Sequence, residues 1–125
     1  MKKVISTALA PAAIGPYAQA VATGDLVITS GQLPINPATG AFPEGIAEQT
    51  RQSLENVKAI LAQAGTGMDR IIKTTVFLSD MNNFGAMNEV YATFFTEGNY
   101  PARSAVEVAR LPKDALVEIE VIAAL

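Results

Sequence analysis

Cysteine and histidine are both absent from this sequence of 125 residues. Without cysteine there is no disulfide, no thiolate nucleophile and no Cys-type zinc site, so the stability of the fold must come from packing. Without histidine the chain lacks the commonest general base, the Ser–His pair of nucleophilic catalysis and the ligand of most first-row metal sites. Any catalysis is therefore left to carboxylates, lysine, tyrosine, serine or threonine, and we expect no metal site.

Long apolar runs and clusters of basic residues are also missing. No stretch is long and apolar enough to cross a bilayer, and the N-terminal segment MKKVISTALAPAAIGPY has no continuous apolar run before its prolines. Nine basic and twelve acidic residues give a formal charge of −3, and the basic residues form no run. Binding to a phosphate backbone depends on clustered Lys and Arg. We therefore expect a mature cytoplasmic protein with neither a membrane nor a nucleic-acid partner.

Apolar residues are abundant, at 50% of the chain, which is enough to build one core at this length. We expect a single domain over residues 1–125. Residues 17–31 form two β-type runs separated by Gly24 and Asp25, a pattern that predicts a hairpin. Residues 33–45 contain three prolines and two glycines, which predicts a surface loop.

Two segments show helical periodicity. From Ile46 to Ala64 an apolar stripe predicts a helix that Gly65 ends. The second stripe, over residues 84–94, predicts a helix with Asp80 or Asn83 as its N-cap and Gly98 as its stop; its residues are Phe84, Met87, Tyr91 and Phe94. We interpret this second stripe as core.

Three further segments, 70–80, 102–109 and 115–124, are rich in β-branched residues and predict strands. The expected order is then strand, strand, helix, strand, helix, strand, strand. Because each helix has one apolar stripe, we expect an α+β fold in which both helices cover one face of a mixed β-sheet. The other face is left without a cover.

Apolar or small residues alternate on both faces of the last two predicted strands. They are Val106, Val108, Val117, Ile119 and Val121 against Ala105, Ala109, Ile122 and Ala124. Two helices can cover only one sheet face, so a second subunit is the expected cover for the other. The sequence thus predicts a homo-oligomer with clefts between subunits.

Charged residues interrupt these strands. Alternation places Arg103, Ala105 and Glu107 on one face of their strand, and Glu118 and Glu120 together on one face of the last strand. One interpretation is that these charges lie on solvated edges or pair with neighbouring basic residues. In the other, Arg103 faces a cleft and holds a small carboxylate through two parallel hydrogen bonds. A glutamate near a second glutamate would then hold its proton tightly enough to act as a proton shuttle and activate a water molecule.

Five segments resemble the RidA/YjgF family of reactive-intermediate deaminases over nearly the whole chain. They are APAAIGPYAQAV, ITSGQLPINPATG, RQSLENVKAIL, KTTVFLSDMNNF and YPARSAVEVARLP. The resemblance implies a chorismate-mutase-like α+β fold and a homotrimer with a ligand cleft at each subunit interface. It also implies hydrolysis of 2-imino acids, chiefly 2-iminobutanoate and 2-iminopropanoate, to 2-oxo acids and ammonia, with no metal or organic cofactor.

The resemblance further implies roles for individual residues. Arg103 matches the arginine that grips the carboxylate, and Glu118 matches the glutamate that orients water, chosen over Glu120 because the functional one comes first in the family pattern. Five positions match substrate-binding residues: Tyr17, Ser30, Gly31, Asn88 and Ala105. Many relatives carry a cysteine where this chain has Ala105, but the site uses the backbone of that position, so activity is expected to survive.

Other functions remain open at this point. Tyr17, Ser30, Gly31 and Asn88 also fit plain structural roles at a strand start, a strand end and a helix surface. A binding or sensing module could use Arg103 to hold a 2-oxo acid without turnover. A ribonuclease, an activity sometimes attached to this family, fits poorly with an acidic chain that has no basic patch.

Overall fold

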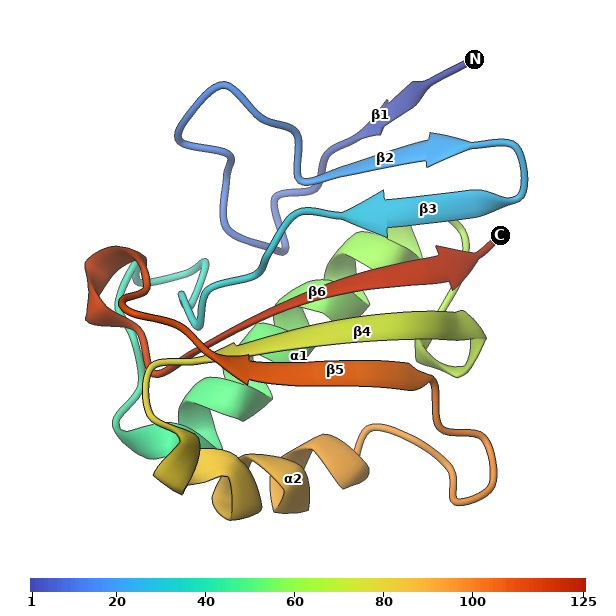
Figure 1. Ribbon diagram of the computed structural model, residues 1–125. Coiled ribbons are helices and arrows are strands. Elements are labelled where there is room, and N and C mark those ends of the chain that lie inside the picture. Colours follow the sequence, from blue (N-terminus) through green and yellow to red (C-terminus); the bar gives the residue numbers. More distant parts are fainter.

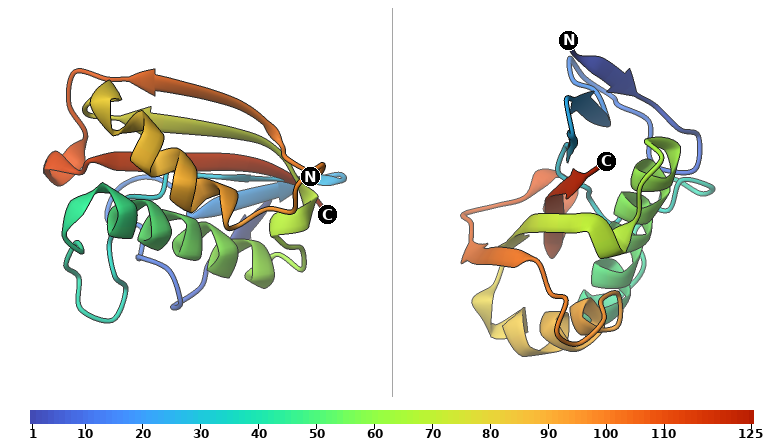
Figure 2. Two further views of the ribbon diagram at one scale, coloured as in Figure 1. Left: turned by 90° about the horizontal axis from the view of Figure 1, so that it is seen from below. Right: turned by 90° about the vertical axis from the view of Figure 1, so that its right-hand side faces the viewer.

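One six-stranded sheet with two helices on one of its faces makes up the computed structural model of this protein, which describes all 125 residues (Figure 1). The strands are β1 (Lys3–Ile5), β2 (Ala20–Thr23), β3 (Leu26–Thr29), β4 (Ile71–Leu78), β5 (Ala102–Glu107) and β6 (Val117–Ala124). The helices are α1 (Gly45–Gln63) and α2 (Phe84–Ala92). Their common side of the sheet is visible from two further directions in Figure 2. The predicted α+β architecture with two layers is confirmed.

The strand order in the sheet is β1-β2-β3-β6-β4-β5. Only β4 and β5 run parallel, and the other neighbours are antiparallel, so the sheet is mixed as predicted. The C-terminal strand β6 is inserted between β3 and β4, so both of its edges are hydrogen-bonded. Strand β5 lies at the edge of the sheet, with no strand on its outer side.

Helix α1 packs its apolar stripe against the sheet. Leu54, Val57, Ile60 and Leu61 are fully buried in the core. The helix ends in a Schellman motif, in which the amide of Thr66 donates to the carbonyl of Leu61 and the amide of Gly65 donates to Ala62. Gly65 has a φ of 88°, a conformation that favours glycine, which explains why the predicted stop is accurate.

Helix α2 is shorter than its periodicity predicts. It ends at Ala92, and the following amides of Phe94 and Phe95 donate three residues back to Tyr91 and Ala92. The last turn is therefore of the tighter 3-10 type. Of the two candidate N-caps, Asp80 accepts from the Asn82 amide at 2.9 Å, which caps the short 3-10 helix that precedes α2, whereas Asn83 makes no side-chain cap.

Several elements escape sequence reasoning because they are too short to show periodicity. Strand β1 has only Ile5 buried, and three 3-10 helices of three residues each lie at Met68–Arg70, Met81–Asn83 and Pro112–Asp114.

Neither helix of the fold combines the length and the hydropathy that a membrane span requires.

The sheet face away from the helices is partly polar, and this corrects the expectation of two apolar faces. Val117, Ile119, Val121 and Ala123 of β6 are buried under the helices, while Glu118 and Glu120 share the open face with Ile122 and Ala124. Val108 and Ala109 lie beyond the end of β5, which is shorter than the predicted strand. Apolar side chains are still exposed on this face, with Ile28 at 46% and Val106 at 43%.

Candidate active site

The predicted site residues form two clusters, and the first cluster surrounds Arg103. Arg103 lies on β5 opposite Thr74 of β4 and points to the helix side of the sheet. Its Nη1 donates to Oδ1 of Asn88 on α2 at 2.6 Å. Both ion pairs of the structure lie elsewhere, between Arg51 and Glu48 and between Arg110 and Asp114. The guanidinium of Arg103 is thus a half-buried cation without a carboxylate partner.

A hollow of about 470 Å³ opens beside this guanidinium. Its lining consists of Asn88, Tyr91, Ala92, Tyr100, Pro101 and Arg103. The size suits a small ligand, and the Arg103 guanidinium supplies the only full charge in the lining. Ala105 is on the same side of β5 as Arg103, and because β5 is an edge strand, its outer backbone groups have no strand partner.

The second cluster of predicted site residues surrounds Glu118, which lies on β6. Its carboxyl lies against Gly31, where a Cβ atom would stand 2.7 Å from the carboxyl carbon. Burial, and next the nearby charge of Glu120, raise the pKa of Glu118 above its ordinary value. The carboxyl therefore gives up its proton less readily than an exposed glutamate.

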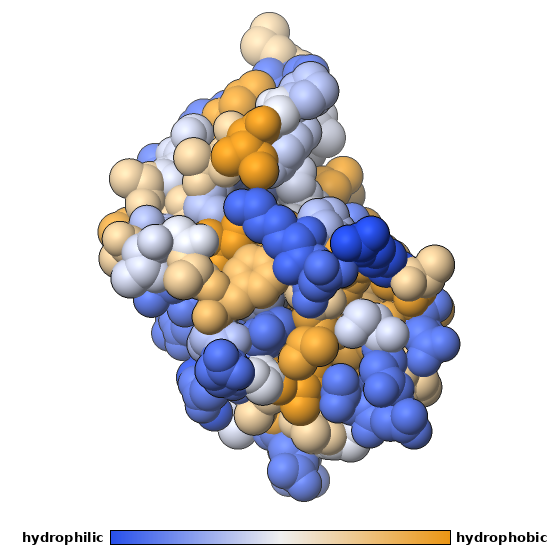
Figure 3. Space-filling view, turned by 90° about the vertical axis from the view of Figure 1, so that its left-hand side faces the viewer, coloured by the Kyte–Doolittle hydropathy of each residue, from blue (hydrophilic) through white to orange (hydrophobic).

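The segment that carries Gly31 is held firmly to β6. The amide of Gln32 donates to the carbonyl of Ile119 at 2.8 Å, and the amide of Ile119 donates back at 3.2 Å. The Ser30 hydroxyl donates to the carbonyl of Ala18 at 2.6 Å, which ties this segment to the loop that carries Tyr17. Tyr17 and Gly31 line one small hollow, and Tyr17 is 50% exposed. Figure 3 shows the side of the molecule that lies on the left in Figure 1, where hydrophobic residues are exposed between strongly hydrophilic ones.

The two clusters of predicted site residues lie on opposite faces of the sheet. Phe77 of β4 pairs with Glu118 on one side and with Val106 on the other, so Glu118 and the Arg103 strand are separated by β4. Arg103 faces the helices, and Glu118 faces away from them. One chain therefore assembles Arg103, Asn88 and Ala105 in one place and Tyr17, Ser30, Gly31 and Glu118 in another, and does not join the two sets.

The other two glutamates of these strands, Glu107 and Glu120, form no ion pair with Arg103. Glu107 does not pair with Arg103, because its Oε1 accepts from the backbone amide of Met81 at 2.8 Å. Glu120 is on the open face with Glu118, away from Arg103. Neither carboxylate neutralises the guanidinium.

Sequence reasoning overlooked two aromatic residues of the Arg103 region. The ring centroids of Tyr91 and Phe84 lie 4.8 Å and 5.4 Å from the guanidinium carbon. Both residues belong to the stripe that was interpreted as core. The spacing of residues 84, 88 and 91, which places a polar side chain between two aromatic ones on one helix face, is the signal that could have found them.

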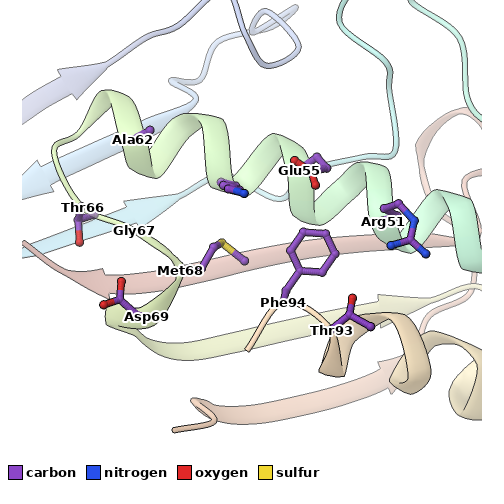
Figure 4. Close-up of a pocket in the computed structure, with 10 residues that line it drawn as sticks. Arg51, Glu55, Ala62, Thr66, Gly67, Met68, Asp69, Thr93 and Phe94 are labelled. Atoms are coloured by element: carbon purple, nitrogen blue, oxygen red, sulfur yellow. The ribbon is translucent and has the colours of Figure 1, made fainter. Parts of the chain in front are cut away.

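The largest hollow, of about 540 Å³, lies elsewhere (Figure 4). Helix α1 borders it on one side, and the Met68–Arg70 helix and the C-terminal end of α2 border it on the other. Met68 and Phe94 lie between Arg51 and Glu55 of α1 on one side and Asp69 on the other. None of the predicted site residues lines it. Charges of both signs border it, so it offers no single ligand chemistry.

Residues 7–125 match the model of the family described as Endoribonuclease L-PSP. The chain belongs to this family, the RidA/YjgF family. The predicted membership is thereby confirmed.

Relatives of known name in this RidA/YjgF family align over almost the whole chain. The 2-iminobutanoate/2-iminopropanoate deaminase of Escherichia coli K12 is 58% identical over 125 residues, covering 98% of each chain. The RutC family protein PM1466 of Pasteurella multocida is 60% identical, also covering 98% of each chain. Among solved structures, the chain is similar to the crystal structure of E. coli TdcF with bound serine. The two sequences are 52% identical, and the structures superpose with a TM-score of 0.93 over 98% of each chain. These likenesses confirm the fold predicted for the family.

Proposed function

We propose that this protein hydrolyses small 2-imino acids, such as 2-iminobutanoate and 2-iminopropanoate, to 2-oxo acids and ammonia. The observation that carries the proposal is the half-buried guanidinium of Arg103, which has no carboxylate partner and borders a hollow of about 470 Å³. It occurs in a chain 58% identical to a protein named as this deaminase. A relative whose crystal structure holds serine, another small molecule with one carboxylate, supports the same ligand class.

Arg103 binds the carboxylate of the imine in this proposal. Asn88 takes one hydrogen bond from Nη1, and the edge formed by Nε and Nη2 has no protein partner. That edge matches the two oxygens of a carboxylate and fixes the plane of the substrate. The carbon of the C=N bond is thereby held in one orientation.

Glu118 moves the proton. As a water oxygen forms its bond to the imine carbon, the Glu118 carboxylate takes a proton from that water and passes it to the imine nitrogen. The resulting carbinolamine collapses when Glu118 takes the hydroxyl proton and delivers it to the amino nitrogen as the C–N bond breaks, which releases ammonia and leaves the 2-oxo acid. The raised pKa of Glu118 suits a group that must both accept and return a proton near neutral pH. No step requires a metal or an organic cofactor.

A complete site requires a second subunit, because Arg103 and Glu118 lie on opposite faces of one sheet. We place the substrate in clefts between the subunits of a homotrimer, where Arg103, Asn88 and Ala105 of one copy meet Tyr17, Ser30, Gly31 and Glu118 of the next. The exposed apolar side chains of Ile28 and Val106 on the open face support a partner chain there. The absence of cysteine fits a reducing, cytoplasmic setting.

The proposed reaction can be measured by trapping the imine. Threonine dehydratase is mixed with semicarbazide, with and without this protein, and formation of the semicarbazone of the imine is followed alongside release of 2-oxobutanoate. The protein should reduce the amount of semicarbazone formed and increase the rate at which 2-oxobutanoate is released. Equal traces with and without the protein would rule the proposal out, and Arg103→Ala should behave as if no protein were present.

A second candidate is a module that binds 2-oxo acids without turnover, and it rests on the same unpaired Arg103. The variant Glu118→Gln distinguishes the enzyme from the binding module. If that variant loses imine hydrolysis but keeps its affinity for 2-oxobutanoate, catalysis is the role of the site. A wild-type protein that binds 2-oxobutanoate and leaves the imine untouched would favour the binding module. Ribonuclease activity, which the family description names, is opposed by the net charge of −3 and the lack of a basic run.

A further inference from the structure

We infer that helix α2 supplies a neutral cradle for Arg103, formed by Phe84, Asn88 and Tyr91, which positions the guanidinium and sets the affinity of the protein for a carboxylate. The inference rests on the proposed carboxylate-binding role of Arg103. The three residues are called the α2 cradle below.

The α2 cradle is one face of a helix. Its members are four and three positions apart, so their side chains project from the same side of α2. Oδ1 of Asn88 lies 2.6 Å from Nη1 of Arg103, and the guanidinium carbon lies 4.8 Å from the ring centroid of Tyr91 and 5.4 Å from that of Phe84. The hydrogen bond of the guanidinium and both of its cation–π contacts therefore come from this one helix face.

The chemistry of the α2 cradle stabilises a positive charge without neutralising it. Aromatic ring faces attract a cation through their quadrupole, and an amide oxygen accepts a hydrogen bond while carrying no net charge. A carboxylate in the position of Asn88 would form an ion pair and compete with the ligand. The α2 cradle keeps the full charge of Arg103 available at the free edge of Nε and Nη2.

Tyr91 is itself fixed in place. Its hydroxyl shares a hydrogen bond of 2.8 Å with the hydroxyl of Thr74, which is fully buried on β4 and pairs directly with Arg103 in the sheet. Burial raises the pKa of the Tyr91 phenol, so the ring remains neutral under the cation. Strand, ring and guanidinium thus form one connected unit.

Loss of the α2 cradle should act on binding more than on the chemical step. Arginine has several rotatable bonds, and holding the guanidinium before the ligand arrives removes part of the ordering cost of binding. The carboxylate is gripped in the ground state and in the transition state alike. Weaker positioning therefore raises KM with a smaller change in kcat.

Fluorinated phenylalanines at position 84 test the electrostatic part directly. Adding one, two and three fluorines to the ring weakens its attraction for a cation with little change of shape. The probe is 2-oxobutanoate, titrated calorimetrically into the full-length protein. The dissociation constant should rise stepwise along the series, in total by roughly threefold to thirtyfold. An unchanged dissociation constant along the series would overturn the inference.

Phe94 provides the matched control, because it is a partly buried phenylalanine packed on the same core without a cation over its ring. The same fluorinated residues at position 94 should leave the dissociation constant unchanged. An equal trend at both positions would mean that general packing, and not the α2 cradle, sets the affinity.

Conventional variants give a second test. Tyr91→Leu removes the ring, and Tyr91→Phe restores it without the hydroxyl, so the phenylalanine variant should recover most of the affinity that the leucine variant loses. Equal affinities in the two variants, measured where both remain folded, would contradict the inference. Because binding is the readout, a wild type that binds 2-oxobutanoate but fails to hydrolyse imines would refute the proposed enzyme and leave this test intact. A wild type that binds no 2-oxobutanoate would refute the α2 cradle as part of a carboxylate site.

Discussion

The carboxyl group of Glu118 lies directly against Gly31, so that a methyl group at Gly31 would stand 2.7 Å from the carboxyl carbon. Real Cβ atoms essentially never approach a heavy atom beyond their own residue and its two chain neighbours within 3.0 Å. The missing side chain at Gly31 therefore determines where the Glu118 carboxyl can stand. In the proposed mechanism this is the group that activates water.

Gly31→Ala should reduce kcat by about 100-fold, because a displacement of the catalytic group by about 1 Å has an effect of this size. The Glu118 side chain is flexible and can swing aside, so the fold should survive with its thermal midpoint little changed. Gly85→Ala is the matched control. Nothing lies within 4 Å of a Cβ atom at Gly85, so that variant should keep full activity and gain about 0.5–1 kcal/mol of helix stability. Full activity in Gly31→Ala would contradict the role of the close approach.

Glu120→Gln should move the acid limb of the pH–rate profile to lower pH. Burial is the first cause of the raised pKa of Glu118, and the charge of Glu120 is the second. Removing that charge removes one of the two causes, so the pKa of Glu118 falls and its carboxylate persists to lower pH. The measurement is kcat/KM for imine hydrolysis as a function of pH. An acid limb that stays in place would show that Glu118 is not the group that titrates.

Glu118→Gln should stabilise the fold at neutral pH and have no such effect in acid. The folded state holds the Glu118 proton more tightly than the unfolded state, because the pKa is raised on folding. Stability is therefore lost as pH rises through the window from the ordinary carboxyl pKa to the raised one. The glutamine variant carries no charge at any pH and escapes this loss. Unfolding midpoints of the variant and the wild type should diverge above that window and coincide below it.

How far the sequence predicts this structure depends on the range of the interaction. Periodicity found the buried stripe of α1 and the alternation of Arg103 and Glu118 on their strands, because both are local properties of the chain. The relation between Arg103 and Glu118 depends on the insertion of β6 between β3 and β4, which no local pattern encodes. The opposite orientation of the two side chains became visible only in the assembled sheet.

Asn88→Asp should weaken the binding of 2-oxobutanoate by roughly tenfold to a hundredfold, a loss of about 1.4 to 2.8 kcal/mol. The substitution replaces a neutral acceptor 2.6 Å from Nη1 of Arg103 with a carboxylate of almost the same shape. The new ion pair satisfies the guanidinium inside the protein and repels the anionic ligand. Asn88→Ala, which removes the contact without adding charge, should bind more tightly than Asn88→Asp. Calorimetric titration of both variants decides the order, and the reverse order would exclude an anion-binding role for this guanidinium.

The loop that carries Tyr17 is held by one buried side chain, Gln19. Its Nε2 donates to the carbonyls of Thr7, Ala10 and Pro11 at 3.0, 3.3 and 2.7 Å, and its Oε1 accepts from the Thr7 amide at 2.7 Å. Gln19 is only 4% exposed. Periodicity gave no sign of this function, because a polar residue just before a strand has no local feature that reveals four backbone partners.

Gln19→Leu should destabilise the fold by about 2–3 kcal/mol, because an apolar side chain of similar size leaves the backbone groups around it without their partners. Local opening of the Tyr17 loop should exceed the global loss, so the Thr7 amide should exchange with solvent faster than amides of β6. Gln63→Leu is the control, since Gln63 is exposed at the end of α1 and should change stability by less than about 0.5 kcal/mol. Thermal unfolding and hydrogen exchange measure the two effects separately. If Tyr17 closes the proposed cleft, Gln19→Leu should also raise KM for the imine, whereas an unchanged KM together with a loosened loop would remove Tyr17 from the site.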